Sequence, residues 1–175
     1  VVDYDGQSAP ELHEGAPAPS EDEKMHYEIF IRRLSNELDT EFLNLPDPQT
    51  DSPGDFISRG EGRTIDFKDP RASGDNIAKV AASMLNTEGG VILVGVDDNG
   101  DTTGISDPDQ KQHDIANTLY NRLNTAMGDI IIERKEVEGD NVILIRLPQS
   151  QESLYEVNGK FYIRIGESKK PMTSE

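Results

Sequence analysis

The feature that most constrains the fold is an unbroken apolar run, Val91-Ile92-Leu93-Val94-Gly95-Val96. A run of this kind, rich in β-branched residues, is typical of a central strand that is covered on both faces. It leads directly into Asp97-Asp98-Asn99-Gly100-Asp101, a cluster of turn-forming residues. The sequence therefore predicts a buried strand that ends in an acidic turn.

Two helices are predicted, one before this strand in the sequence and one after it. The first is capped by Ser73 or Asp75 and stops at Gly89-Gly90. Its apolar face consists of Ile77, Val80, Ala81, Met84 and Leu85. The second helix spans about residues 109–127, where apolar residues recur every four positions, namely Ile115, Leu119, Leu123 and Met127.

The remaining strands follow from shorter patterns. Alternation predicts a half-buried strand near the start, and Glu138-Gly139-Asp140-Asn141 and Asn158-Gly159 have the composition of hairpin turns. The predicted strands cover residues 63–68, 130–137, 142–147, 154–157 and 161–165. The order β-α-β-α-β-β-β-β predicts an α+β domain with a mixed β-sheet and two main helices on one face, preceded by an extra N-terminal helix.

The first sixty residues differ in character from the rest. Residues 1–19 are rich in Pro, Gly, Ala and acids, which predicts a disordered acidic tail. A capping-box pattern begins an amphipathic helix over residues 20–45, whose apolar stripe is more often a packing face than a surface for a partner. Prolines then predict a connector over residues 46–60, so the domain is expected to span residues 61–175.

Charge and composition narrow the function classes. The net charge is −17. Residues 1–63 contain 15 acidic and 5 basic residues and so carry more than half of this charge, whereas residues 64–175 contain 19 acidic and 12 basic residues. A polyanionic partner would therefore need a local basic strip. The absence of cysteine excludes a disulfide framework and a thiolate zinc site. No apolar run approaches the roughly 20 residues of a membrane span, and a cytoplasmic protein without a membrane partner is expected.

Acidic residues are predicted to meet at one edge of the sheet. Glu61 precedes the first strand, Asp66 lies on its polar face, and Asp97 or Asp98 follows the central strand. Carboxylate oxygens suit Mg²⁺ or Mn²⁺, which can activate water and neutralise charge on a phosphate. Lys68 shares the strand face of Asp66 and would supply a cation to that phosphate. In so acidic a chain, accidental proximity and ordinary turn chemistry are the competing explanation.

Other chemical motifs are weak. The chain contains no GxxxxGK[ST] phosphate loop, so no ATP site of that type is recognised, and no serine stands in a GxSxG elbow. Near the C-terminus, Arg164, Lys169 and Lys170 accompany Tyr162 in a small basic strip. This strip is suited to holding a nucleic-acid backbone, although a solvated strand end is the default interpretation.

Five motifs occur in order with consistent gaps. They are Asp66-Phe67-Lys68, Asn86-Thr87-Glu88-Gly89-Gly90, Ile92-Leu93-Val94-Gly95-Val96-Asp97-Asp98-Asn99-Gly100, Gly104-Ile105, and Tyr162-Ile163-Arg164-Ile165-Gly166 with Pro171. Together they resemble the Schlafen AlbA domain family over about residues 60–172. The resemblance implies a nucleic-acid-associated domain, which in microbial proteins is often a DNA-binding part of a transcriptional regulator.

In animal Schlafens, related domains form a metal-dependent endoribonuclease for structured RNA such as tRNA, which uses three carboxylates. The resemblance implies that Glu61 and Asp66 match two family glutamates and that Asp98, with Asp97 as the alternate, matches the third acid. Lys68 matches the family lysine. Asp66 departs from the usual glutamate, and its shorter side chain puts cleavage in doubt.

The resemblance bears on the oligomeric state, and it leaves a rival hypothesis for the function. The animal enzymes pair two such lobes around RNA, so a single domain would need to form a homodimer. The rival hypothesis is a non-catalytic module for DNA binding, transcriptional regulation or protein interaction. For the nucleic-acid-binding hypotheses the expected partner is RNA or DNA.

Overall fold

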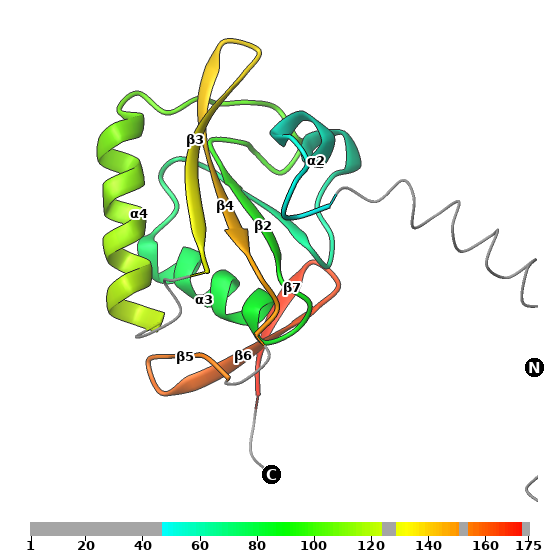
Figure 1. Cartoon of the computed structure of the whole chain (residues 1–175), viewed down its shortest axis with the longest axis vertical. Helices are drawn as coiled ribbons and strands as arrows, with labels where there is room; N and C mark the ends of the chain where they lie inside the picture. Colours follow the sequence, from blue (N-terminus) through cyan, green and yellow to red (C-terminus); the bar gives the residue numbers. More distant parts are fainter. Residues whose placement is uncertain (1–46, 124–128, 151–153, 173–175) are drawn as a thin grey trace, which may run out of the picture. The chain divides into compact units, whose positions relative to one another are not determined.

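The computed structural model describes residues 47–123, 129–150 and 154–172. All of these residues belong to the second of two compact units, which spans Pro46–Glu175. The predicted tail and the predicted helix of residues 1–45 lie outside the described residues. The described elements follow in the order α2 (Pro53–Arg59), β1 (Ile65–Lys68), α3 (Gly74–Leu85), β2 (Gly90–Val94), α4 (Pro108–Leu123), β3 (Ile131–Val137), β4 (Asp140–Leu147), β5 (Glu156–Val157), β6 (Lys160–Ile165) and β7 (Ser168–Pro171) (Figure 1).

The main sheet has four strands in the order β1-β2-β4-β3. β1 and β2 are parallel, because α3 crosses between them, and the other two pairings are antiparallel. β2 is therefore an interior strand, and all five of its residues are buried. The predicted α+β class, with a mixed sheet, is confirmed.

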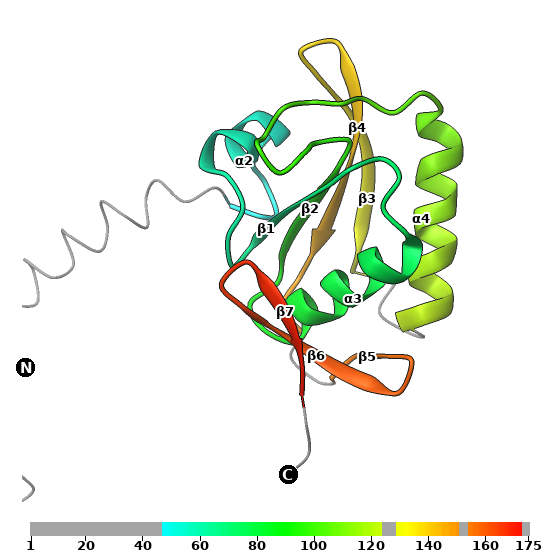
Figure 2. The same cartoon turned by 180° about the vertical axis from the view of Figure 1, so that it is seen from behind.

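Both faces of this sheet are covered. Ile92, Val94, Ile143 and Ile145 pack in one core with α3 and α4. Alternate residues of the same strands point the other way, and Val91, Leu93 and Leu144 pack in a second core with Phe56 of α2. Figures 1 and 2 show α2 across the sheet from α3 and α4. The expectation that the helices lie on one face therefore holds for α3 and α4 but not for α2.

α2 lies where a proline-rich connector over residues 46–60 was expected. Ser52 caps it through a capping box with Asp55, and Pro53 occupies the first turn, where the missing N–H costs no helical hydrogen bond. Phe56 is fully buried. Arg146 of β4 fixes the preceding turn, because its guanidinium donates to the carbonyl oxygens of Pro48 (2.7 Å) and Asp51 (2.9 Å). The segment is thus an integral part of the domain.

A second sheet contains β5, β6 and β7, all antiparallel. The predicted hairpin at Asn158-Gly159 is confirmed, with φ angles of 55° and 72° at the turn. β7 was not predicted. β5, β6 and β7 form a sheet separate from the four-stranded one, whereas one mixed sheet was expected.

Asn86, the residue that caps the C-terminus of α3, holds this small sheet. Its side-chain amide donates to the carbonyl oxygens of Tyr155 (2.8 Å) and Tyr162 (2.9 Å), and its carbonyl accepts from the Tyr155 N–H (2.7 Å). Immediately afterwards, Gly89 adopts a φ of 75° as the helix ends. A Cβ on Gly89 would lie 2.5 Å from the Leu147 carbonyl oxygen, so only glycine allows β2 to start this close to β4.

Candidate functional site

Asp66 is the buried centre of the predicted site. Strand alternation directs Ile65 and Phe67 into the core with α2, so Asp66 points to the opposite face of β1. The sequence suggested that this face is solvated. Only 4% of Asp66 is exposed, however, because Arg164 of β6 lies against it. The face of β1 expected to be polar and open is therefore buried.

The guanidinium of Arg164 is fully engaged. Its Nη1 donates to Asp66 Oδ1 (2.8 Å), while Nη2 donates to the carbonyl oxygens of Gly62 (2.7 Å) and Ile65 (3.0 Å). Its Nε also donates to Gly62, at 3.0 Å. The side chain is 1% exposed. Its direct contact with nucleic acid stays a prediction, and its visible role is to position Asp66 and the start of β1.

Glu61 and Lys68 cover the free edge of β1. The Phe67 N–H donates to Glu61 Oε1 (2.6 Å), and Lys68 Nζ donates to the Phe67 carbonyl oxygen (2.8 Å). Lys68 also forms an ion pair with Asp66 Oδ2, an oxygen that accepts no hydrogen bond from the described residues. Side chains thus satisfy the outward backbone groups of an edge strand, which would otherwise be open to another chain.

Two of the predicted acids, Asp66 and Asp98, lie within electrostatic reach of the third, Glu61. Burial is the largest cause that raises the pKa of the Glu61 carboxyl above its usual value, and the hydrogen bond from Phe67 opposes it. The negative charges of Asp66 and Asp98 also raise this pKa, while Lys68 lowers it. β1 and the exit of β2 therefore bring the three acids together electrostatically, as their order in the sequence suggests.

Asp97 and Asp98 differ in what they contact. Asp97 Oδ1 accepts from the backbone N–H groups of Asn99 (2.9 Å) and Asp101 (3.0 Å), so Asp97 holds the turn. Asp98 is exposed, and its carboxylate forms no hydrogen bond or ion pair with the described residues. Asp98 is consequently the freer of the two to meet a ligand.

The donor set does not fit a three-carboxylate metal site in this arrangement. Within the ranges that the structure describes, no three His, Cys, Asp or Glu side chains are grouped so as to hold a metal ion. Glu61 Oε1 and Asp66 Oδ1 already accept hydrogen bonds, and Asp66 Oδ2 faces the Lys68 ammonium. A metal at Glu61, Asp66 and Asp98 stays a prediction that requires these side chains to rearrange.

The two predicted C-terminal lysines lie on opposite faces of β7. Lys169 pairs across the strands with Arg164, and its Nζ donates to Asn76 Oδ1 of α3 at 2.6 Å. Lys170 pairs with Ile163 and is exposed on the outer face. Burial, followed by the charge of Lys68, lowers the pKa of Lys169. Only Lys169 therefore adjoins the Asp66 region.

Asn76 and Lys79 on α3 were not recognised in the sequence. They lie three residues apart, on the part of α3 that Lys169 reaches. Lys79 forms an ion pair with Asp75 at 2.6 Å. The only sequence signal was their separation on a predicted helix, and that signal does not identify the strand that packs on them.

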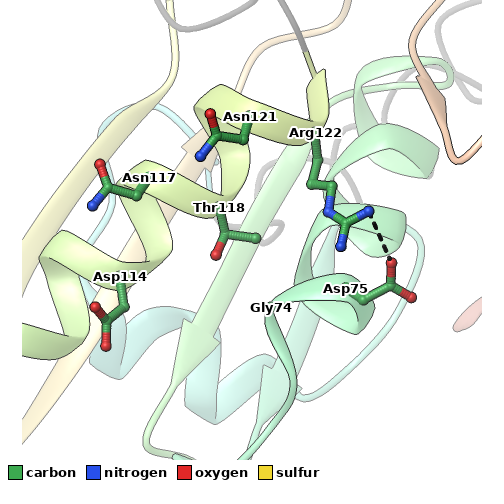
Figure 3. A pocket seen from close by; sticks show the side chains of 7 residues that line it. All are labelled: Gly74, Asp75, Asp114, Asn117, Thr118, Asn121 and Arg122. Atoms are coloured by element: carbon green, nitrogen blue, oxygen red, sulfur yellow. Dashed lines mark ion pairs between the residues drawn. The ribbon is translucent and has the colours of Figure 1, made fainter.

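The structure also contains an open polar pocket of about 740 Å³ between the start of α3 and one side of α4 (Figure 3). Its lining residues are Gly74, Asp75, Asp114, Asn117, Thr118, Asn121 and Arg122. A Cβ on Gly74 would come within 2.8 Å of the Thr118 side chain, so the two helices approach closely here. Arg122 lies 4.0 Å from Asp75 across the pocket.

Comparison with known families gives one clear match. A family model described as Schlafen, AlbA_2 matches residues 61–173. These bounds agree closely with the motifs identified in the sequence and include both sheets of the domain. The chain matches no curated protein. No described helix is long and apolar enough to cross a membrane.

Two solved structures resemble the domain. The crystal structure of the DIP2311 protein from Corynebacterium diphtheriae has a TM-score of 0.51 and 23% identity, and the match covers 63% of this chain but only 25% of that protein. The second is the N-terminal domain of a RecG-related protein of Nitrosomonas europaea, proposed to be an ATP-dependent DNA helicase. It has a TM-score of 0.54 and 25% identity, with 72% of this chain and 96% of that domain covered.

Proposed function

This chain belongs to the Schlafen AlbA_2 family, and from that membership we propose that its domain binds nucleic acid. The observation that carries the proposal is the concentration of cations beside Asp66. Lys68 forms an ion pair with Asp66, and Lys169 lies opposite the Asp66 partner Arg164 in the strand register, on a chain whose net charge is −17. The similar N-terminal domain of the Nitrosomonas europaea protein, which is named for a DNA helicase, supports the same class of partner.

Binding assays with several nucleic acids test this proposal. Fluorescence anisotropy with labelled transfer RNA, single-stranded DNA and duplex DNA should give affinities that weaken as salt increases, because phosphate contacts release counterions. The comparison among the three ligands decides between RNA and DNA. Absence of binding to all three at low salt would contradict the proposal, since electrostatic attraction is strongest there.

A finer hypothesis is metal-dependent cleavage of structured RNA by Glu61, Asp66 and Asp98. It is favoured by the match of these residues to the family pattern and by the charges of Asp66 and Asp98, which both raise the pKa of Glu61. For it to hold, Asp66 Oδ2 must exchange the Lys68 ammonium for a metal, with Glu61 and Asp98 beside it. Mg²⁺ or Mn²⁺ would there activate water and neutralise phosphate charge.

Incubation of transfer RNA with and without Mn²⁺ tests this hypothesis. Asp98→Ala is the informative variant, because Asp98 is exposed and its replacement should leave the fold intact. Asp101→Ala, an exposed acid of the same turn, is the matched control. Cleavage that persists in Asp98→Ala would exclude Asp98, and an absence of cleavage in the wild type would leave a non-catalytic binding domain.

A second candidate is a protein-interaction module. The outer face of the β5-β6-β7 sheet exposes Leu154 (54%), Phe161 (38%), Ile165 (60%) and Met172 (46%). Exposed large apolar side chains, where they form a continuous patch, often mark a surface that binds another protein. A second copy of the chain is the partner that fits the expected homodimer, and Ile165→Glu should then shift the mass measured by analytical ultracentrifugation from dimer to monomer. A monomeric wild type would exclude this role for the face.

A further inference from the structure

Lys169 lies within electrostatic reach of two lysines from other elements, Lys68 and Lys79, and of Asp66. Lys68 comes from the end of β1, Lys79 from α3 and Lys169 from β7, and they are called here the lysine cluster. Asp66 links Lys68 to the β6-β7 hairpin, because one carboxylate oxygen contacts Lys68 and the other contacts Arg164 of β6. Lys169 lies opposite Arg164 in the strand register. The hydrogen bond from Lys169 to Asn76 then leads to α3, where Lys79 follows one turn later.

The surroundings of Lys169 contain more positive than negative charge, because Lys68, Lys79 and Arg164 act on it against Asp66 alone. Glu61 and Asp98 belong to the Lys68 side of the region, where Glu61 feels the charges of both Lys68 and Asp98. Among the described residues, Asp66 is paired with both Arg164 and Lys68, and Asp75 is paired with Lys79. Lys169 forms no ion pair in the described part of the chain, and its ammonium donates to a neutral amide oxygen. Like charges this close repel one another, so an anion that enters the cluster gains attraction from several cations.

The environment of Lys169 agrees with this charge count. Burial is the first cause that lowers the pKa of its ammonium, and Lys68, Lys79 and Arg164 lower it further, with only Asp66 opposing them. A partly buried lysine surrounded by cations is stabilised when a bound anion supplies the missing negative charge.

From this geometry we infer that the lysine cluster is a binding site for a phosphate of the nucleic-acid backbone, with Lys169 as its principal contact. The inference rests on the proposed nucleic-acid binding and adds the position and chemistry of one contact. Asn76 also contributes to this site, because its side-chain carbonyl accepts a hydrogen bond from the Lys169 ammonium and so orients it. Lys170 has no part in it, since it lies on the opposite face of β7.

The test measures how nucleic-acid affinity depends on salt. Lys169→Gln should lower the affinity at low salt by about tenfold and reduce the slope of log affinity against log salt by about one unit, the effect of losing one phosphate contact. Lys169→Arg keeps the charge and should keep the slope. Lys160→Gln, an exposed lysine at the start of β6, is the matched control and should change neither.

Inorganic phosphate provides a second readout that does not need nucleic acid. Titration followed by NMR should shift the side-chain amide signals of Asn76 in the wild type and not in Lys169→Gln. Circular dichroism and unchanged amide signals in β2 and β4 would show that the variant is folded.

Two results would overturn the inference in distinguishable ways. Nucleic-acid binding with an unchanged salt slope in Lys169→Gln, or an equal loss in Lys170→Gln, would exclude the cluster and leave the proposed function standing. If the wild type binds inorganic phosphate but neither RNA nor DNA, the assignment to a nucleic-acid backbone fails together with the proposed function.

Discussion

In the four-stranded sheet, Ile92, Leu93, Leu144 and Ile145 are completely buried among other apolar side chains. In the three-stranded sheet, only Val157 and Tyr162 reach the core, and polar side chains make the remaining attachments. Apolar packing tolerates small shifts, whereas a hydrogen bond weakens steeply when its distance or angle changes. The position of the small sheet therefore depends on a few residues, and the same residues surround the candidate site.

Arg164→Met should have the largest effect, because it removes the hydrogen bonds from β6 to Asp66 and Ile65 of β1 and to Gly62, and leaves Asp66 paired with Lys68 alone. Breaking a buried ion pair by removing one partner costs about 3–5 kcal/mol. Urea denaturation should show this loss in the free energy of unfolding. Adding Asp66→Asn should restore much of the stability, since no uncompensated charge remains. A cost below about 1 kcal/mol for Arg164→Met would mean that the small sheet is held by other contacts.

Asn86→Ala should have the next largest effect and should act locally. It leaves the Tyr155 N–H and the carbonyl oxygens of Tyr155 and Tyr162 without their partner. The expected loss is about 2 kcal/mol. Hydrogen exchange should accelerate in β5 and β6 while β2 and β4 stay protected. Asn117→Ala, an exposed asparagine of α4, is the control, and equal acceleration throughout the domain would refute the distinction between the two sheets.

Substitutions in the acidic turn after β2 should have smaller effects on stability, and these effects should differ between the neighbouring Asp97 and Asp98. Asp97→Ala removes two side-chain to backbone hydrogen bonds and should cost about 1 kcal/mol. Asp98→Ala should change stability by less than about 0.5 kcal/mol, because Asp98 has no such bonds. Thermal unfolding of both variants measures the difference. Equal costs would show that the turn does not depend on Asp97.

Glu61→Gln should give the smallest effect, visible only as a pH dependence. The raised pKa means that the folded state holds the Glu61 proton more tightly than the unfolded state. The stability that this provides is complete below the unfolded pKa and is lost as pH rises through the folded pKa. Gln stays neutral and can still accept from Phe67. The variant should therefore gain stability relative to wild type as pH rises from about 4, the pKa of an unfolded glutamate, through the raised folded pKa of Glu61, as measured by urea denaturation at each pH. A constant difference would show that Glu61 titrates normally.

Local signals predicted much of this fold. α3 has a cap, an apolar face and a glycine stop within one short segment, and Asn158-Gly159 specifies its hairpin without help from distant residues. α2 was missed because Pro53 was taken as a helix breaker, although a proline in the first turn after a Ser52 cap favours a helix. β7 was missed because its Ser-Lys-Lys-Pro sequence has little β propensity and forms a strand only by pairing with β6.

The site was predictable only in part, for a related reason. The spacing of Asp66 and Lys68 placed them on one strand face, and the order of the strands brought Asp98 near Glu61. No local pattern could indicate that Arg164, 98 residues later, neutralises Asp66. The burial of Asp66 and the contact of Lys169 with Asn76 are tertiary features, and they change an open acidic edge into a mixed cluster that contains partly buried lysines.

The long separation between Asp66 and Arg164 has a consequence for how the domain is made. During synthesis, β1 and β2 leave the ribosome well before the β6-β7 hairpin, and contacts between distant residues form late. Until Arg164 arrives, the Asp66 carboxylate and the carbonyl oxygens of Gly62 and Ile65 lack the guanidinium that binds them in the complete domain. Release of the nascent chain before residue 164 would therefore leave a carboxylate of β1 without its arginine partner, although Glu61 and Lys68 already cover the strand edge.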